Sequence, residues 1–141
     1  MMFLLDTNVV SETGKKKPHG AVLAWIAAVP VEELFISAMT IAEIQVGAER
    51  TREHDLAKAT EIEAWLNWLI ETSQVVPMDA DVAKIWAKLM QGRSRALAED
   101  AWIAATAKTK RLTIATRNLR AFAGFDVETF NPFEDVRAQN P

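Results

Sequence analysis

The chain has 141 residues, of which 50% are hydrophobic, and its formal charge at pH 7 is -3. This length is that of one domain with one hydrophobic core. A negative net charge excludes a surface that is basic throughout, so a nucleic-acid partner would require a local basic patch. The chain has no cysteine, which excludes a disulfide framework and a thiolate metal site.

No segment has the composition of a membrane anchor or of a signal peptide. The longest apolar stretch, residues 21–31, contains Pro30 and is far shorter than the ~18 residues that suggest a membrane span. The N-terminus has no basic residue before its apolar residues and meets an acid at Asp6. We therefore expect a cytoplasmic protein with no membrane contact.

The hydrophobic pattern alternates short buried strands with amphipathic helices. The expected strands are residues 3–5, 34–37, 74–78, 112–115 and, with its assignment left open, 125–130. The expected helices are residues 18–29, 40–52, 55–72, 79–92 and one that opens at Glu99 or Asp100 and continues past Ala107. This alternation predicts an α/β fold with a parallel twisted sheet of four or five strands and helices on both faces. One domain, residues 1–141, accounts for the chain, with a polar tail at about 134–141.

Four oxygen-bearing side chains follow strands or open helices. Asp6 follows the first strand, and Glu43 lies in the first turn of the helix after the second strand. Asp100 opens the helix before the fourth strand, and Asn118 follows that strand. Because ligands of parallel sheets bind outside the carboxyl ends of the strands, we expect these four residues to meet there.

Such a cluster of acids predicts a metal-dependent nuclease. Carboxylates ~5 Å apart repel by roughly 3 kcal/mol per pair at an effective dielectric constant near 20, so a cation is expected among them. Oxygen ligands without His or Cys suit Mg²⁺ or Mn²⁺. Such an ion would activate a water, orient the scissile phosphate and neutralise developing charge, while Asp6 or Asp100 holds the attacking water.

Each acid also has a purely structural interpretation. Thr40 and Glu43 have the spacing of a capping box, in which Glu43 satisfies the N-terminus of its own helix. The helix dipole favours Asp100 in a first turn without any metal. Asp6 could cap a short turn.

The cationic side chains fall into two groups. His19, His54 and the lysines at 15–17 lie in polar surroundings and are expected to be solvated. The arginines that flank the expected acids are candidates for binding substrate phosphates, and these are Arg93, Arg95 and Arg117, with Arg120 close by.

Five stretches together resemble the PIN-domain family. Residues 4–12 look like the family's opening motif, and residues 41–47, 100–107 and 116–118 are similar to its second, third and fourth motifs. Residues 130–133 match its closing segment. Four motifs in the right order over nearly the whole chain are specific where one would not be. The chain resembles the VapC toxins of the FitB-like branch.

This resemblance implies the toxin of a type II toxin-antitoxin system, an endoribonuclease that uses Mg²⁺ or Mn²⁺. It implies a homodimer paired with a small antitoxin and bound to DNA only through that antitoxin. Asp6, Glu43 and Asp100 match the family's metal-binding acids, and Asn118 stands at the fourth position. Thr7 and Thr116 match polar residues around the site, and that the substrate is RNA rests on the resemblance alone.

Asn118 departs from the family's pattern. Many relatives have an acid either at this position or three residues later, where this chain has Ala121. The missing carboxylate bears on metal affinity and on the number of ions, and Glu99 or Asp126 are substitutes that match no motif. We expect Asn118→Asp to tighten Mn²⁺ binding and to destabilise the protein without metal.

Two other functions compete with the nuclease. A catalytically weakened PIN-like interaction module would bind an antitoxin, and DNA through it, without cleaving RNA. A phosphoacceptor receiver domain would need a second acid after Asp6, where Thr7 and Asn8 stand. The tryptophans mostly follow helical spacing and are expected in the core or in oligomer contacts, and we expect a self-association face at Trp86, Met90 and Trp102.

Overall fold

A computed structural model describes residues 1–134, so the expected polar tail lies outside the described residues except for Glu134. Five parallel strands form one sheet in the order β3-β2-β1-β4-β5. The strands are β1 (Phe3–Leu5), β2 (Leu34–Ser37), β3 (Gln74–Val76), β4 (Thr113–Ala115) and β5 (Thr129–Phe130). The predicted α/β fold with a parallel sheet is therefore confirmed, and the strand left open exists as a pair of residues at the edge.

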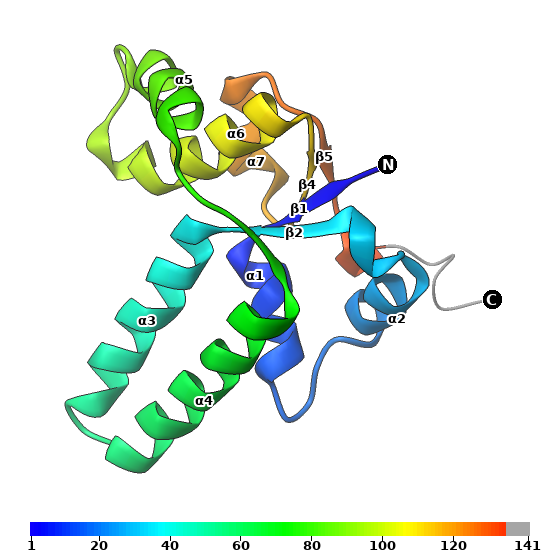
Figure 1. Ribbon diagram of the computed structural model, residues 1–141, viewed down its shortest axis with the longest axis vertical. Helices are drawn as coiled ribbons and strands as arrows, with labels where there is room; N and C mark the ends of the chain where they lie inside the picture. The colour runs from blue at the N-terminus through cyan, green and yellow to red at the C-terminus, as the bar shows by residue number, and fades with distance from the viewer. Residues whose placement is uncertain (135–141) are drawn as a thin grey trace.

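Helices cover both faces of the sheet, as Figure 1 shows, with α5, α6 and α7 on one side and α1, α2, α3 and α4 on the other. The helices are α1 (Thr7–Val10), α2 (Gly20–Ala28), α3 (Ala38–Arg52), α4 (Leu56–Thr72), α5 (Ala80–Met90), α6 (Ala98–Lys110) and α7 (Leu119–Phe122). Short 3₁₀ segments are η1 (Ser11–Gly14), η2 (Val31–Glu33), η3 (Arg95–Leu97), η4 (Ala123–Phe125) and η5 (Pro132–Glu134). Within residues 1–134 no helix combines the length and apolar character needed to cross a membrane.

The core consists of two clusters, one on each face of the sheet. Successive side chains of a strand point to opposite faces. Leu4 and Ile114 accordingly belong to the cluster beneath α5, α6 and α7, whereas Leu5 and Ala115 belong to the cluster beneath α1 to α4. The central strands are thus buried on both sides, which is why they read as unbroken apolar runs in the sequence.

Helix α3 begins earlier than its sequence predicts, and this corrects the role expected of Glu43. Ser37 is the N-cap, because its Oγ accepts a hydrogen bond from the Met39 backbone N–H at 3.0 Å. Thr40 is therefore a buried residue inside the helix, and Glu43 lies in the second turn. The interpretation of Thr40 and Glu43 as a capping box is therefore wrong. The Glu43 carboxylate is free for another role.

The hydrophobic pattern did not predict two short helices, α1 and α7. Each has four residues, less than the window over which a helical period can be recognised. Asp6 caps α1 by accepting from the Thr7 backbone N–H at 2.8 Å, and Asn118 caps α7 by accepting from the Ala121 backbone N–H at 3.3 Å. The chain therefore turns into a helix directly after both β1 and β4.

Helices α4 and α5 follow their predicted patterns closely. Asp79 caps α5 as expected, accepting from the Val82 backbone N–H at 3.0 Å. Gly92 follows the end of α5 with a φ of 75°, a conformation that favours glycine. In α4, Leu66 and Leu69 are buried, whereas Ile70 is 42% exposed.

Two of the three residues expected to form a self-association face pack within the chain. The Trp86 Nε1–H donates to the Ala98 carbonyl at 3.0 Å, and Trp86 and Met90 lie against the cluster beneath α5 to α7. Trp102 on α6 is partly buried. Trp86 and Met90 thus join α5 to α6, and a homodimer stays a prediction.

The two-sided burial of the central strand predicts a large cost for shortening it. Leu4 is 0% exposed, so Leu4→Ala should lower the free energy of unfolding by about 3 kcal/mol, within the range for cavities in well-packed cores. The same truncation at Leu56, which is 64% exposed, should cost less than about 0.5 kcal/mol. Urea unfolding of both variants measures the difference, and equal losses would contradict this account of the core.

Candidate functional site

The candidate site lies at the carboxyl edge of the sheet, where the central strand and its two neighbours end. Asp6 directly follows β1, and Thr116 directly follows β4. On the other side of β1, strand β2 leads into α3, which carries Thr40 and Glu43. Asp100 comes from the first turn of α6. Segments remote in sequence thus contribute to one edge, as predicted.

Asp6 is a buried carboxylate that is held on both oxygens. It is 8% exposed. Oδ1 accepts from the Thr7 backbone N–H at 2.8 Å, while Oδ2 accepts from Thr116 Oγ1–H at 2.8 Å and from Asn8 Nδ2–H at 3.2 Å. Hydrogen bonds to a charged oxygen are stronger than neutral ones, so the carboxylate is fixed in place. The supporting positions expected for Thr7 and Thr116 agree with this geometry.

A second layer of hydrogen bonds joins Asp6 to its neighbouring strands. Asn8 Nδ2 also donates to Thr116 Oγ1 at 3.2 Å, and Asn8 Oδ1 accepts from the Arg117 backbone N–H at 3.1 Å. The hydroxyls of Thr7 and Thr40 are 3.1 Å apart and share a hydrogen bond. This role of Asn8 was not predicted. The sequence feature that could have indicated it is an amide, able to donate and to accept, two residues after the central acid.

The acids form one electrostatic cluster. Burial, and then repulsion from Glu99, Asp6 and Asp100, raises the pKa of Glu43 to about 7, although the Thr7 hydroxyl opposes the shift. Burial followed by repulsion from Asp6 and Glu99 raises the pKa of Asp100. Burial raises the pKa of Asp6 against the hydrogen bonds that it accepts. Each of these carboxylates is therefore costly to keep charged without a nearby cation.

Of the two substitutes considered for a fourth acid, only Glu99 belongs to this cluster. Its charge contributes to the raised pKa values of Glu43 and Asp100. Asp126 is fully exposed, and its carboxylate is 4.0 Å from Lys108 Nζ. It shares a pocket with Arg111 at the end of the sheet where β4 begins. The suggestion that Asp126 substitutes for the fourth acid is therefore wrong.

The donor chemistry fits a hard divalent cation, but the acids do not form a closed cage. Asp6, Glu43 and Asp100 offer only oxygen atoms, the ligands that Mg²⁺ and Mn²⁺ prefer. Within residues 1–134 no three His, Cys, Asp or Glu side chains are arranged to hold an ion together. Because Mg²⁺ usually keeps several waters and takes one or two carboxylates besides substrate phosphates, an open set of acids is compatible with it.

Asn118 lies at the rim of the site, with its side-chain oxygen already engaged. The residue is exposed, Oδ1 caps α7, and its backbone N–H donates to Thr116 Oγ1 at 3.0 Å. In this structure Asn118 acts as a turn residue after β4. This is the role expected of Asn118 if it does not bind a metal.

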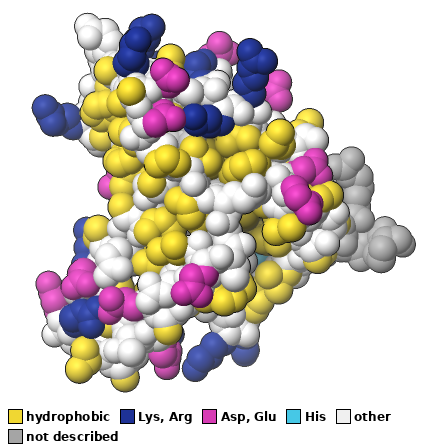
Figure 2. Space-filling view, viewed as in Figure 1, with side chains coloured by type: hydrophobic (Ala, Val, Ile, Leu, Met, Phe, Trp, Pro, Cys, Tyr) yellow, Lys and Arg dark blue, Asp and Glu magenta, His cyan; other side chains and the backbone are white. Residues whose placement is uncertain are grey.

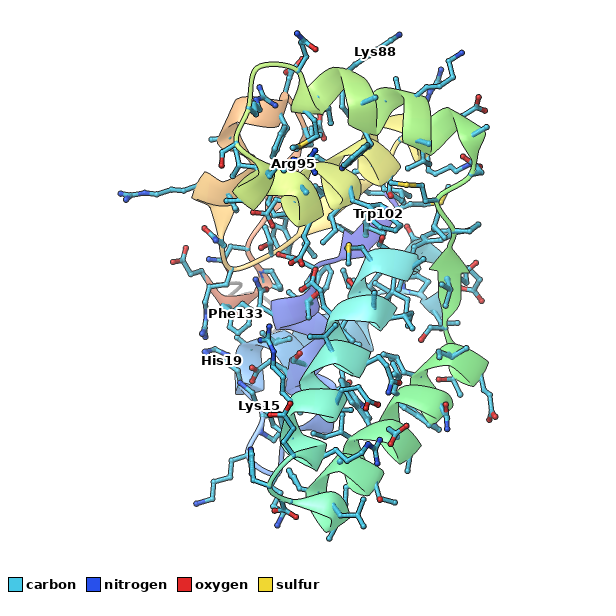
Figure 3. The ribbon with its side chains drawn as sticks, turned by 90° about the vertical axis from the view of Figure 1, so that its left-hand side faces the viewer. Lys15, His19, Lys88, Arg95, Trp102 and Phe133 are labelled. Carbon is cyan, nitrogen blue, oxygen red and sulfur yellow. The ribbon has the colours of Figure 1, made fainter. Side chains whose placement is uncertain are left out.

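The three candidate arginines differ in their availability. Arg93 is the most engaged, because its guanidinium donates to the carbonyls of Leu89 and Gly124 and lies 4.5 Å from the Phe125 ring centroid. Arg95, in η3, is exposed on the side of the molecule shown in Figure 3. Arg117 is exposed, with its guanidinium 3.8 Å from the centroid of the Phe133 ring.

A pocket beside Glu43 was not anticipated. It has a volume of about 230 Å³ between α3 and the start of α6, and it is lined by Met39, Glu43, Val46, Arg50 and Glu99. Arg50 is a cation that the sequence patterns did not single out, because it lies outside the motif at residues 41–47. The pocket extends the acidic cluster along α3.

The fold and the site together define a class of α/β domain. In this class a fixed carboxylate follows the central parallel strand, and further acids surround it. A family model described as PIN domain matches residues 3–127. The chain belongs to the PIN-domain family.

Relatives match the chain over nearly its full length. Toxin FitB of Neisseria gonorrhoeae is 34% identical over 95% of this chain and 100% of its own. A VapC ribonuclease of Sinorhizobium fredii is 34% identical over 94% of this chain and 99% of its own. A solved structure of FitAB bound to an IR36 DNA fragment superposes with a TM-score of 0.80, at 34% identity over 94% of this chain and 96% of the matched chain.

The raised pKa of Glu43 predicts how stability depends on pH. Because this pKa is about 7 in the folded protein and near 4.5 when unfolded, the folded state binds the proton more tightly between these values. Stability should therefore rise as the pH falls from 8 to 5, and Asp6 and Asp100 act in the same direction. Glu43→Gln should flatten the dependence of the melting temperature on pH.

Glu71, exposed on α4, provides the matched control for that measurement. Glu71→Gln should leave the pH dependence of the melting temperature as in the unmodified protein. Curves of the Glu43 and Glu71 variants that run parallel from pH 5 to pH 8, in metal-free buffer, would refute the assignment.

Proposed function

We propose that this protein is the toxin of a type II toxin-antitoxin pair and an endoribonuclease that depends on Mg²⁺ or Mn²⁺. The observation that carries the proposal is the Asp6 carboxylate, buried and held on both oxygens at the centre of an acidic cluster. The names of the relatives, toxin FitB and a VapC ribonuclease, support the reaction and the biological role.

In the proposed mechanism Asp6, Glu43 and Asp100 hold the cation, directly or through its waters. When bound, the cation would lower the pKa of a water and neutralise charge on the scissile phosphate. Thr116 and Asn8 keep the Asp6 oxygens oriented. Because its pKa of about 7 leaves Glu43 partly protonated at neutral pH, Glu43 would have to lose its proton to hold a cation.

The proposed partners are a small antitoxin, an RNA substrate and, through the antitoxin alone, DNA. The similar structure of FitAB with a DNA fragment supports this arrangement. An apolar groove of about 280 Å³, lined by residues that include Ile26, Val31, Trp68 and Leu69, offers a surface for the antitoxin. Hydrophobic side chains are also spread over the face that α3 and α4 present in Figure 2. A homodimer and a cytoplasmic location complete the proposal.

The alternative is a catalytically weakened module that binds an antitoxin without cleaving RNA. The specific observation in its favour is the neutral Asn118 at the fourth position, together with the open arrangement of the acids among residues 1–134. The two functions differ in whether a divalent cation supports RNA cleavage.

We expect RNA cleavage with Mg²⁺ or Mn²⁺ that stops in excess chelator. Asp6→Asn and Asp100→Asn should each lower the cleavage rate by more than about 100-fold, beyond the usual effect of residues that only orient ligands. Asp81→Asn, on the exposed side of α5, should leave the rate unchanged. Far-ultraviolet circular dichroism confirms that all three variants fold. Cleavage that continues in chelator would rule the mechanism out.

Asn118→Asp tests whether this position reaches the cation. Asp and Asn are similar as N-caps, so the variant should keep the α7 cap that Asn118→Ala loses at a cost of about 1 kcal/mol. The added carboxylate should tighten Mn²⁺ binding and, by joining like charges, destabilise the metal-free protein. Calorimetric titration and melting curves measure both effects. Unchanged Mn²⁺ affinity would show that Asn118 is only a cap.

A further inference from the structure

Three consecutive lysines, Lys15 to Lys17, follow η1 in a protein whose net charge is -3. Lys15, Lys16 and Lys17 are exposed in the segment between η1 and α2, and we call them, with Arg117, the lysine strip. Figure 3 shows Lys15 on the same side of the molecule as Arg95, with His19 and Phe133 between them. Arg117 follows Thr116 at the carboxyl edge of the sheet, and its charge acts on Glu12, which pairs with Lys15.

A buried acid fixes the shape of this segment. Glu12 is 4% exposed, and its carboxylate accepts from Lys15 Nζ–H and from the His19 backbone N–H at 2.9 Å. Burial tends to raise the pKa of Glu12, but these hydrogen bonds and the attraction of Lys15 and Arg117 hold that pKa below its ordinary value. An ionised carboxylate inside the protein thus ties both ends of the segment, between which Lys16 and Lys17 are exposed.

Arg117 connects the strip to the central acid. Its guanidinium lies over the Phe133 ring, and that ring meets the His19 ring edge-on at 5.1 Å. Its backbone N–H donates to Asn8 Oδ1, and Asn8 in turn donates to Asp6. Arg117 thus connects the central acid, through Asn8, with the end of the lysine segment at His19.

Lys15 pairs with Glu12, and the other cations of the strip are available to bind a phosphate. Arg52, Lys58, Lys108 and Lys110 pair with acids, whereas no ion pair among residues 1–134 includes Lys16, Lys17 or Arg117. Lysines act as point charges on a backbone and read no base. The Phe133 ring is covered by Arg117, so it offers no open surface on which a base could stack.

We propose that the lysine strip binds the phosphate backbone of single-stranded RNA and carries the strand from the acidic cluster across Arg117 and along Lys15 to Lys17. The inference rests on the proposed function for its substrate class and adds the direction of the strand. It also accounts for how an acidic protein accepts a polyanion, since the strip supplies positive charge locally.

The experiment measures binding without cleavage. The probe is a fluorescein-labelled single-stranded oligoribonucleotide of mixed sequence, titrated in excess chelator at several salt concentrations. Lys16→Ala/Lys17→Ala should reduce the slope of log K against log salt by about 1.4, at about 0.7 for each lost phosphate contact, and should weaken binding roughly tenfold or more at 0.1 M salt. Lys15 is left intact because it pairs with Glu12.

The matched control changes the same charge elsewhere. Lys84→Ala/Lys88→Ala, on exposed positions of α5, should change neither the slope nor the affinity, and Figure 3 shows Lys88 at the end of the molecule away from Lys15. Equal effects of the two double variants would overturn the proposal, because any lysine would then serve. Absence of RNA binding by the unmodified protein would overturn it too.

Cleavage separates this inference from the proposed function. With Mn²⁺, the Lys16/Lys17 variant should show a raised KM for long RNA with kcat unchanged. If the unmodified protein binds RNA as described but cleaves no RNA with any divalent cation, the proposed nuclease activity is refuted, whereas RNA binding by the lysine strip is supported. If the Lys16/Lys17 variant no longer binds a purified antitoxin but keeps its affinity for RNA, the strip is a protein interface and the proposal is overturned.

Discussion

The burial of one carboxylate at the end of the central strand is the constraint on which this structure depends. Moving an ionised carboxylate out of water is costly unless hydrogen bonds replace its hydration. Asp6 receives them from the Thr7 backbone, from Thr116 and from Asn8. Because these donors come from α1 and from the end of β4, the sheet must bring β1 and β4 together before the charge can be accommodated.

The same burial ties the fold to its chemistry. The charges of Asp6, Asp100 and Glu99 act on Glu43 across the edge of the sheet and raise its pKa to about 7. Stability and proton binding are therefore coupled at this edge, and the acidic cluster carries a cost that a bound cation would relieve. Glu12 is also buried, and Lys15 together with the His19 backbone N–H keeps it ionised.

Most of the fold followed from local patterns in the sequence. Buried apolar runs located the strands, helical spacing located the long helices, and Asp79 and Gly92 marked the limits of α5. The failures were local as well. Helices α1 and α7 are too short to show a period, and the spacing of Thr40 and Glu43 suggested a cap that Ser37 supplies instead. An N-cap depends on where the preceding strand ends, which this spacing alone did not reveal.

The sequence by itself determined the alternation of strands and helices and the acids placed at their ends, because these depend on residues close together in the chain. Only the tertiary structure decided which side chains complete the site. Thr116 reaches Asp6 across 110 positions, Asn8 reaches Thr116 across 108, and Arg93 turns away to carbonyls of α5 and η4. Such contacts follow from the order of strands in the sheet and from packing between layers, and a one-dimensional pattern carries neither.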